Sequence, residues 1–261
     1  MDQATLGTLV SALGPAKVTG FFLVLARISP LFLVAPLFSS QLLPAKAKSV
    51  VAVGLAIGMT PLAVRGVTIP TEPLAVTGLI VEQLLVGLAF AFAVGAVLYA
   101  VEMAGSLADN VSGFSFGAQV DPINGNQGGS VTNMYTLVGL AMFIAIGGDA
   151  WVLRGLAKTF SLVPLTGSAA IASLTGGVEQ AFGSIFIGAV EVDAPVLLAM
   201  MVTDVAFGMV TKVVPQVNVF GVGFAMKVGV TMLVIAAALP FISGFMSNQI
   251  SSAVTGALAS V

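Results

Sequence analysis

Seven charged residues lie in or beside long apolar segments, and they are the first candidates for chemistry: Arg27, Glu82, Glu102, Asp109, Asp204, Lys212 and Lys227. A charge at the centre of a bilayer costs about 3 kcal/mol on insertion scales, so such side chains usually pair, line water or reach the interface. One interpretation is a proton relay carried by Glu82, Glu102 or Asp109. The other is ion pairing between segments or subunits, which fixes their register. Pairing is favoured because the acids are spread over separate segments, with no histidine to bridge them.

The chain has neither cysteine nor histidine. Disulfides and thiolate nucleophiles are therefore excluded, and the commonest general base and transition-metal ligand are missing. The carboxylates form no run that would hold a hard metal ion, and no glycine-rich phosphate loop is present. An intramembrane enzyme would need a Ser–Lys or paired-Asp site, and no such pair stands out. We therefore expect no enzyme activity, no metal and no cofactor.

The composition predicts an integral membrane protein. Hydrophobic residues make up 58% of the chain and charged residues 8%, and the mean hydropathy is +1.10, whereas soluble domains carry about 25% charged residues. The formal net charge of the whole chain, −2, is too small to suggest nucleic acid or anionic lipid as a partner. The segment Met1–Gly14 lacks the positive start and apolar core of a signal peptide, so we expect no cleaved leader.

The stretch Ser106–Ser130 lies between two apolar segments and differs from both. It contains two phenylalanines framed by glycines and then a rigid turn: Gly113, Phe114, Phe116, Gly117, Asp121 and Pro122. An extended backbone would place both rings on the same side, whereas a helix would turn them about 200° apart. The glycines favour a loop. Such a loop could form a deformable hydrophobic plug, or it could be a re-entrant loop whose rings pack in the protein core.

Apolar segments that we expect to form membrane helices alternate with short polar turns, and one of them, Ser49–Val64, is short for a span. The candidate segments are Val18–Phe38, Ser49–Val64, Leu74–Val101, Val131–Ala150, Glu179–Thr211 and Val213–Val261. Pro30 predicts a kink or split in the first segment, and Pro215 predicts a stop between the last two, which then form a helical hairpin. Ser161–Gly177 is expected to be a loop with a possible short helix. Basic residues divide evenly between the two sides of a six-span arrangement, so they give no orientation.

Three motifs occur in order along nearly the whole chain: ARISPLFLVAPLF at 26–38, FSFGAQVDP at 114–122 and VPQVNVFGVGFAMKVG at 214–229. Their order and spacing resemble those of the FliR family, the flagellar biosynthetic proteins of the type III export gate. In the third motif, which resembles the family's hairpin turn, Pro215, Gln216, Phe220 and Lys227 stand in matching places. Injectisome homologues share the resemblance, but the Val-Asp-Pro ending of the second motif favours the flagellar branch.

The resemblance implies an all-α membrane protein whose kinked helices and helical hairpins pack into a helical export-gate assembly, with an internal non-helical plug loop. It implies a FliP-like part over residues 1–177, with the plug loop at 106–130, and a FliQ-like C-terminal hairpin over 178–261. The implied partners are FliP and FliQ, other flagellar export apparatus proteins, and unfolded flagellar proteins as substrates. The implied location is the bacterial inner membrane at the flagellar basal body.

The resemblance also implies a function for the central loop. The channel plug would consist of Gly113, Phe114, Phe116 and Gly117, set in place by Asp121–Pro122. Gln119 departs from this pattern, because it is polar where the family is expected to be more apolar. The alternative function is a secondary transporter that uses the intramembrane charges. Transporter folds usually show two similar halves, and this sequence shows no such symmetry.

Overall fold

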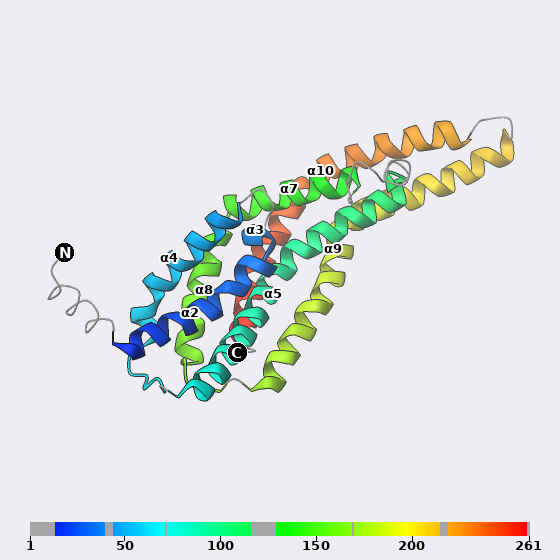
Figure 1. The fold of residues 1–261 in the computed structure, drawn as a ribbon. Helices are drawn as coiled ribbons and strands as arrows, with labels where there is room; N and C mark the ends of the chain where they lie inside the picture. Colours follow the sequence, from blue (N-terminus) through cyan, green and yellow to red (C-terminus); the bar gives the residue numbers. More distant parts are fainter. Residues whose placement is uncertain are drawn as a thin grey trace. The chain divides into compact units, whose positions relative to one another are not determined.

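The computed structural model describes residues 14–39, 44–70, 72–115, 129–168, 170–214 and 219–259. Within these ranges every regular element is an α-helix, which confirms the predicted fold class. The helices are α2 (Pro15–Val34), α3 (Pro36–Ser39), α4 (Ala45–Ala63), α5 (Pro73–Ser112), α7 (Ser130–Ala145), α8 (Gly148–Leu162), α9 (Ile171–Val213) and α10 (Val219–Ala259) (Figure 1).

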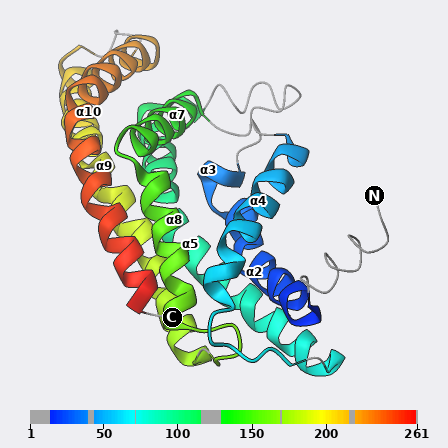
Figure 2. The ribbon, with the colours of Figure 1, turned by 90° about the vertical axis from the view of Figure 1, so that its left-hand side faces the viewer.

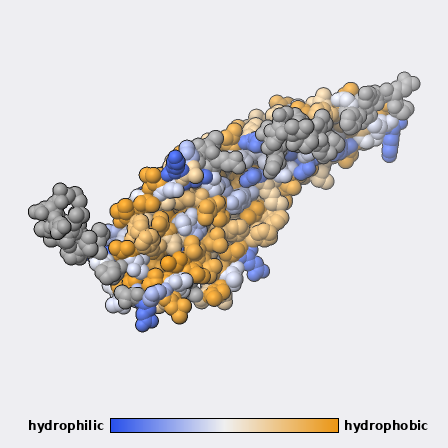
Figure 3. Space-filling view, in the orientation of Figure 1, coloured by the Kyte–Doolittle hydropathy of each residue, from blue (hydrophilic) through white to orange (hydrophobic). Residues whose placement is uncertain are grey.

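Five of these helices, α2, α4, α5, α9 and α10, are long and apolar enough to cross a membrane. Helices α7 and α8 qualify together as a pair bent by 68°. The three longest helices have 40, 43 and 41 residues, about twice the roughly 20 that a bilayer requires. A helix of this length that crosses a bilayer extends beyond the hydrocarbon layer. Apolar side chains also dominate the surface seen in Figure 3, as a membrane protein requires.

The chain forms two compact units that are interleaved in sequence. The first unit contains residues 1–95, 149–181 and 251–261, and the second contains residues 96–148 and 182–250. Helices α5, α9 and α10 each contribute to both units. The sequence predicts a different division, near residue 177, between a FliP-like part and a FliQ-like hairpin. The two compact units do not test that resemblance, so the division near residue 177 stays a prediction.

In the first unit, α2 packs beside α4 (Figure 2). The buried side chains Val24, Ile28 and Leu31 lie on one stripe of α2, at the i, i+4, i+7 spacing of an amphipathic helix. Helix α2 also meets α5 at very close range. A Cβ atom at Gly87 would lie 2.1 Å from the carbonyl oxygen of Arg27. A glycine is needed there because the two backbones touch.

Of the kink or split predicted at Pro30, the split is wrong, because α2 continues through this proline and ends at Val34. Pro30 cannot donate a backbone hydrogen bond to the carbonyl of Ala26. The hydroxyl of Ser29 donates to that carbonyl instead, over 3.1 Å, which compensates the missing bond. The break falls at Ala35, whose backbone is extended because residues before a proline avoid the helical region. Pro36 then begins α3.

Two loop boundaries also differ from expectation. Helix α5 continues to Ser112, so residues 106–112 of the predicted plug loop are helical. Helix α9 begins at Ile171, inside the predicted loop Ser161–Gly177. The small residues of that stretch permit a helix, and Leu174 is buried in it against Val86, Ala89 and Val163. Tertiary burial therefore outweighs the weak local helix preference.

We predict that Gly87→Ala destabilises the first unit by about 1–3 kcal/mol, because the new methyl group cannot fit against the α2 backbone. Gly78→Ala is the matched control on the same helix, since a Cβ there meets nothing within 4 Å. Thermal unfolding of the purified protein in detergent measures both changes. Equal midpoints for the two variants would contradict the close contact of α2 with α5.

Candidate functional site

The structure describes the base of the predicted plug loop. Gly113 and Phe114 follow the end of α5, and the chain is described again from Gly129, just before α7. Phe116, Gly117, Asp121 and Pro122 lie outside the described residues, and so do Pro215 and Gln216 of the predicted hairpin turn. Phe220 lies in the first turn of α10. The described part of the site therefore consists of the residues that hold the two ends of the loop.

Helix α5 ends at a glycine that the turn requires. Gly113 has φ of +87°, a left-handed conformation that glycine adopts freely and other residues rarely do. Just before it, the buried hydroxyl of Ser112 donates to the carbonyl of Ala108, one helical turn back, over 2.5 Å. Phe114 is half-buried. Gly113 thus directs the chain out of the helix immediately before the first phenylalanine of the loop.

The other end of the loop is held by Asp109, which lies one turn before the end of α5. Its carboxylate oxygens accept hydrogen bonds from the backbone N–H groups of Val131 and Thr132, with N···O distances of 3.0 and 2.8 Å. They also accept one from the hydroxyl of Thr132, with an O···O distance of 2.5 Å. Asp109 is 3% exposed. These N–H groups belong to the first turn of α7, where they have no partners within the helix. A negative charge is also favourable at a helix N-terminus, so Asp109 acts as the cap of α7.

Glycines allow the two helices to come close enough for this cap. A Cβ at Gly129 would lie 2.0 Å from a carboxylate oxygen of Asp109. Further along, a Cβ at Gly105 would lie 2.8 Å from the Cα of Thr132, and one at Gly139 would lie 3.0 Å from a methyl group of Val101. Helix α7 therefore runs back along α5 with small residues at the contact. The loop between Gly113 and Gly129 begins and ends at one place.

Lys227 connects the α9–α10 hairpin to the C-terminal end of α5. Its Nζ atom lies 2.5 Å from the carboxylate of Asp204 on α9. It also lies 3.5 Å from the carbonyl oxygen of Val111, in the last turn of α5. A cation is favourable beside the free carbonyls of a helix C-terminus. Because both partners are partly exposed to solvent, each contact contributes little energy, but together they join α9, α10 and α5.

Arg27 makes a corresponding connection within the first unit. It is fully buried. Its Nε donates to the side-chain oxygen of Gln83 over 2.6 Å, and its Nη1 donates to the carbonyl of Thr159 over 3.0 Å. The guanidinium also lies 4.5 Å from the centre of the Phe160 ring, a favourable cation–π geometry. Arg27 thereby joins α2, α5 and α8.

The three candidate carriers of a proton relay are divided between the two units. Glu82 lies in the first unit, whereas Glu102 and Asp109 lie in the second. Glu102 and Asp109 are seven residues apart on α5, about 10 Å along the helix axis, and Asp109 is engaged with α7. Lys212 is exposed in the last turn of α9, where a positive charge is favourable.

Asp193 is a buried acid that the sequence analysis did not single out. It is fully buried on α9, and neither carboxylate oxygen has a hydrogen-bond partner among the described residues. The sequence could have indicated this residue, because an acid within the apolar segment Glu179–Thr211 is unusual. It differs from Asp109, which is nearly as buried but makes three hydrogen bonds.

Comparison with known proteins identifies relatives over most of the chain. Residues 18–253 match the family described as bacterial export proteins, family 1. The chain is 26% identical to the flagellar biosynthetic protein FliR of Pectobacterium carotovorum subsp. carotovorum, covering 90% of this chain and 89% of that protein. It is 27% identical to FliR of Bacillus subtilis, covering 88% and 90%. It is 22% identical to the surface presentation of antigens protein SpaR of Salmonella typhimurium, covering 80% and 78%.

We predict that Asp109→Ala destabilises the loop base by about 1–3 kcal/mol, because it leaves N–H groups of α7 buried without a partner. Hydrogen exchange at the amides of Val131 and Thr132 should become faster. Asp193→Ala is the matched control: it removes the same atoms from a buried site in the same unit but breaks no hydrogen bond to a described residue. Unchanged exchange at both amides in Asp109→Ala would show that the cap is not formed.

Proposed function

The chain belongs to the family of bacterial export proteins, family 1, as a component of the type III export apparatus, and from this premise we propose that it is a core subunit of the flagellar export gate. In this function it forms and seals the inner-membrane channel through which unfolded flagellar proteins pass. The proposed role is non-enzymatic. Its proposed place is the flagellar basal body.

The observation that supports this proposal most directly is the geometry of the loop base. A seal in a channel must occupy a defined position when closed, and it must yield to a passing chain without losing that position. Gly113 sets the direction in which the chain leaves the end of α5. Asp109, near the same end of α5, holds the first turn of α7 in place. The phenylalanines lie between these two fixed points. Large apolar rings at a constriction exclude water and ions by dewetting, so we propose Phe114 and Phe116 as the sealing side chains.

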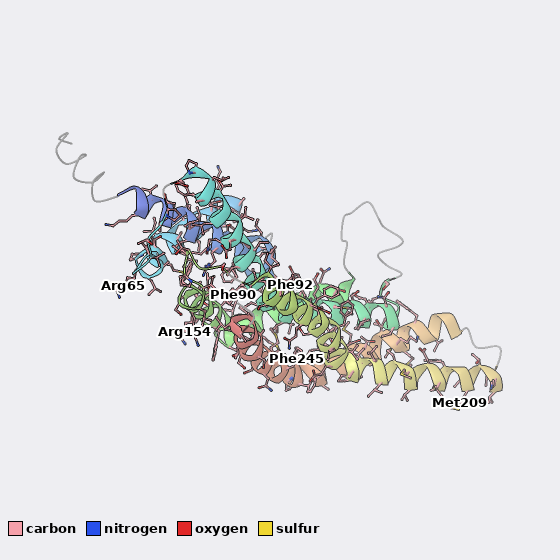
Figure 4. All side chains as sticks on the ribbon, turned by 90° about the horizontal axis from the view of Figure 1, so that it is seen from below. Arg65, Phe90, Phe92, Arg154, Met209 and Phe245 are labelled. Atoms are coloured by element: carbon pink, nitrogen blue, oxygen red, sulfur yellow. The ribbon has the colours of Figure 1, made fainter. Side chains whose placement is uncertain are left out.

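A stripe on α9 supports the proposal of a multi-subunit gate. Its members are large apolar side chains that are each more than 60% exposed: Leu198, Val202, Val205, Met209 and Val213. Their spacing of three or four residues places them along one side of the helix for about 22 Å. Figure 4 shows Met209 near the end of the hairpin. Helices of neighbouring subunits would cover such a stripe, and we propose FliP and FliQ as those neighbours.

We predict that replacing Phe114 and Phe116 together with alanine raises ion leakage several-fold through the assembled gate in liposomes, because the dewetted constriction is lost. The control is the double replacement of Phe182 and Phe186 with alanine. These two exposed phenylalanines pack edge-to-face on α9. Leakage that stays at the wild-type level in the loop variant, with assembly intact, would refute the assignment of the seal.

We predict that Val205→Glu reduces several-fold the amount of partner protein that copurifies with this chain, because a charge would be buried in the subunit contact. Val210→Glu is the matched control, since Val210 is also exposed and lies about 100° around the helix from the stripe. The measurement is the subunit composition of the affinity-purified complex. Equal recovery of partners with both variants would argue against the stripe as an interface.

A further inference from the structure

The first unit contains an apolar groove between α2 and α4. It has a volume of about 810 Å³ and is lined by Phe21 and Phe22 from α2 and by Ile57 and Val64 from α4 and its following turn. The nearby hydroxyl of Thr60 donates to the carbonyl of Ala56 over 2.6 Å. The hydroxyl hydrogen is therefore already used, and the groove wall presents an almost purely apolar surface. The volume lies in the range of ligand-binding pockets.

Two basic side chains border the same groove. Lys17 is in the first turn of α2, and Arg65 is in the turn that follows α4. Because α2 and α4 pack antiparallel, these two positions lie at the same end of the pair: a Cβ at Gly20, near Lys17, would lie 2.6 Å from a methyl group of Val64. Both basic residues are exposed, and Arg65 lies at the edge of the structure in Figure 4.

These basic positions also mark one end of two candidate membrane spans. The candidate spans cover Lys17–Val34 and Ala45–Ala63, so Lys17 begins the first span and Arg65 lies two residues beyond the end of the second. Lys and Arg at such positions lie at the level of lipid headgroups, and basic pockets between membrane helices bind anionic headgroups. An apolar groove with two cations at its interfacial end is complementary to a molecule with a hydrocarbon chain and a phosphate.

We propose that the groove between α2 and α4 is a binding site for an anionic phospholipid. One acyl chain lies against Phe21, Phe22, Ile57 and Val64, and the phosphate lies between Lys17 and Arg65. The planar guanidinium of Arg65 is suited to hold two phosphate oxygens, while Lys17 acts as a point charge. This site is separate from the loop base, and it does not depend on the function proposed above.

The test is native mass spectrometry of the complex purified from nanodiscs that contain phosphatidylglycerol and phosphatidylcholine in equal amounts, with identical acyl chains. We expect phosphatidylglycerol to be retained in preference to phosphatidylcholine. Lys17→Gln and Arg65→Gln should each weaken retention of phosphatidylglycerol about fivefold, the effect of one basic residue near a membrane surface. Lys158→Gln is the control, because it removes an exposed positive charge from α8 of the same unit.

A second pair of variants tests the apolar part of the site. Ile57→Trp should fill the groove and abolish retention of the bound lipid, whereas Leu62→Trp, at an exposed position of α4 outside the groove, should leave it unchanged. Equal retention of both lipids would overturn the proposal, and so would equal effects of Lys17→Gln, Arg65→Gln and Lys158→Gln. A cross-link from position 57 to a helix of another subunit, with no lipid retained, would identify the groove as a subunit contact instead.

Discussion

The hydrogen bonds from the first turn of α7 to the carboxylate of Asp109 are the interaction on which the candidate site depends. A carboxylate that is 3% exposed in an apolar protein is costly unless its charge is balanced. The N-terminus of α7 supplies both N–H donors and a favourable dipole. Neither group is satisfied without the other, so the end of α5 and the start of α7 are held together. The loop between them therefore has one fixed base, although it joins two helices.

Two other charged residues serve a similar structural purpose: Arg27, which is buried, and Lys227, which is partly exposed. Arg27 links α2, α5 and α8 through amide, carbonyl and aromatic partners, and Lys227 links the α9–α10 hairpin to α5. In an apolar chain the hydrophobic effect does not specify which helices meet or in which register, because every face is apolar and lipid competes for it. A few polar contacts with strict geometry can specify both. This use of charge favours the pairing interpretation over a proton relay.

Much of the architecture could be predicted from the sequence, because spans of about 20 apolar residues are a strong signal. The all-α fold and the final hairpin follow from such spans. Helix ends were less predictable: Pro30 lies inside α2 because Ser29 compensates for it, and this depends on a local contact. Asp109 could be selected as an unusual charge, but its cap involves backbone groups 22 and 23 residues away. The close approach of Gly129 to Asp109 follows only from packing in three dimensions, whereas Asp193 could have been selected as an acid within an apolar segment.

The most direct test of the central claim is to place a photo-crosslinking amino acid at position 116 in an assembled gate that holds a stalled export substrate. If the loop seals the channel, illumination should cross-link this position to the substrate polypeptide, and the yield should fall when no substrate is present. Cross-links only to lipid, or only to the helices of this chain whether or not substrate is stalled, would contradict the claim. They would place the phenylalanines in the protein core or at the membrane surface rather than in the export path.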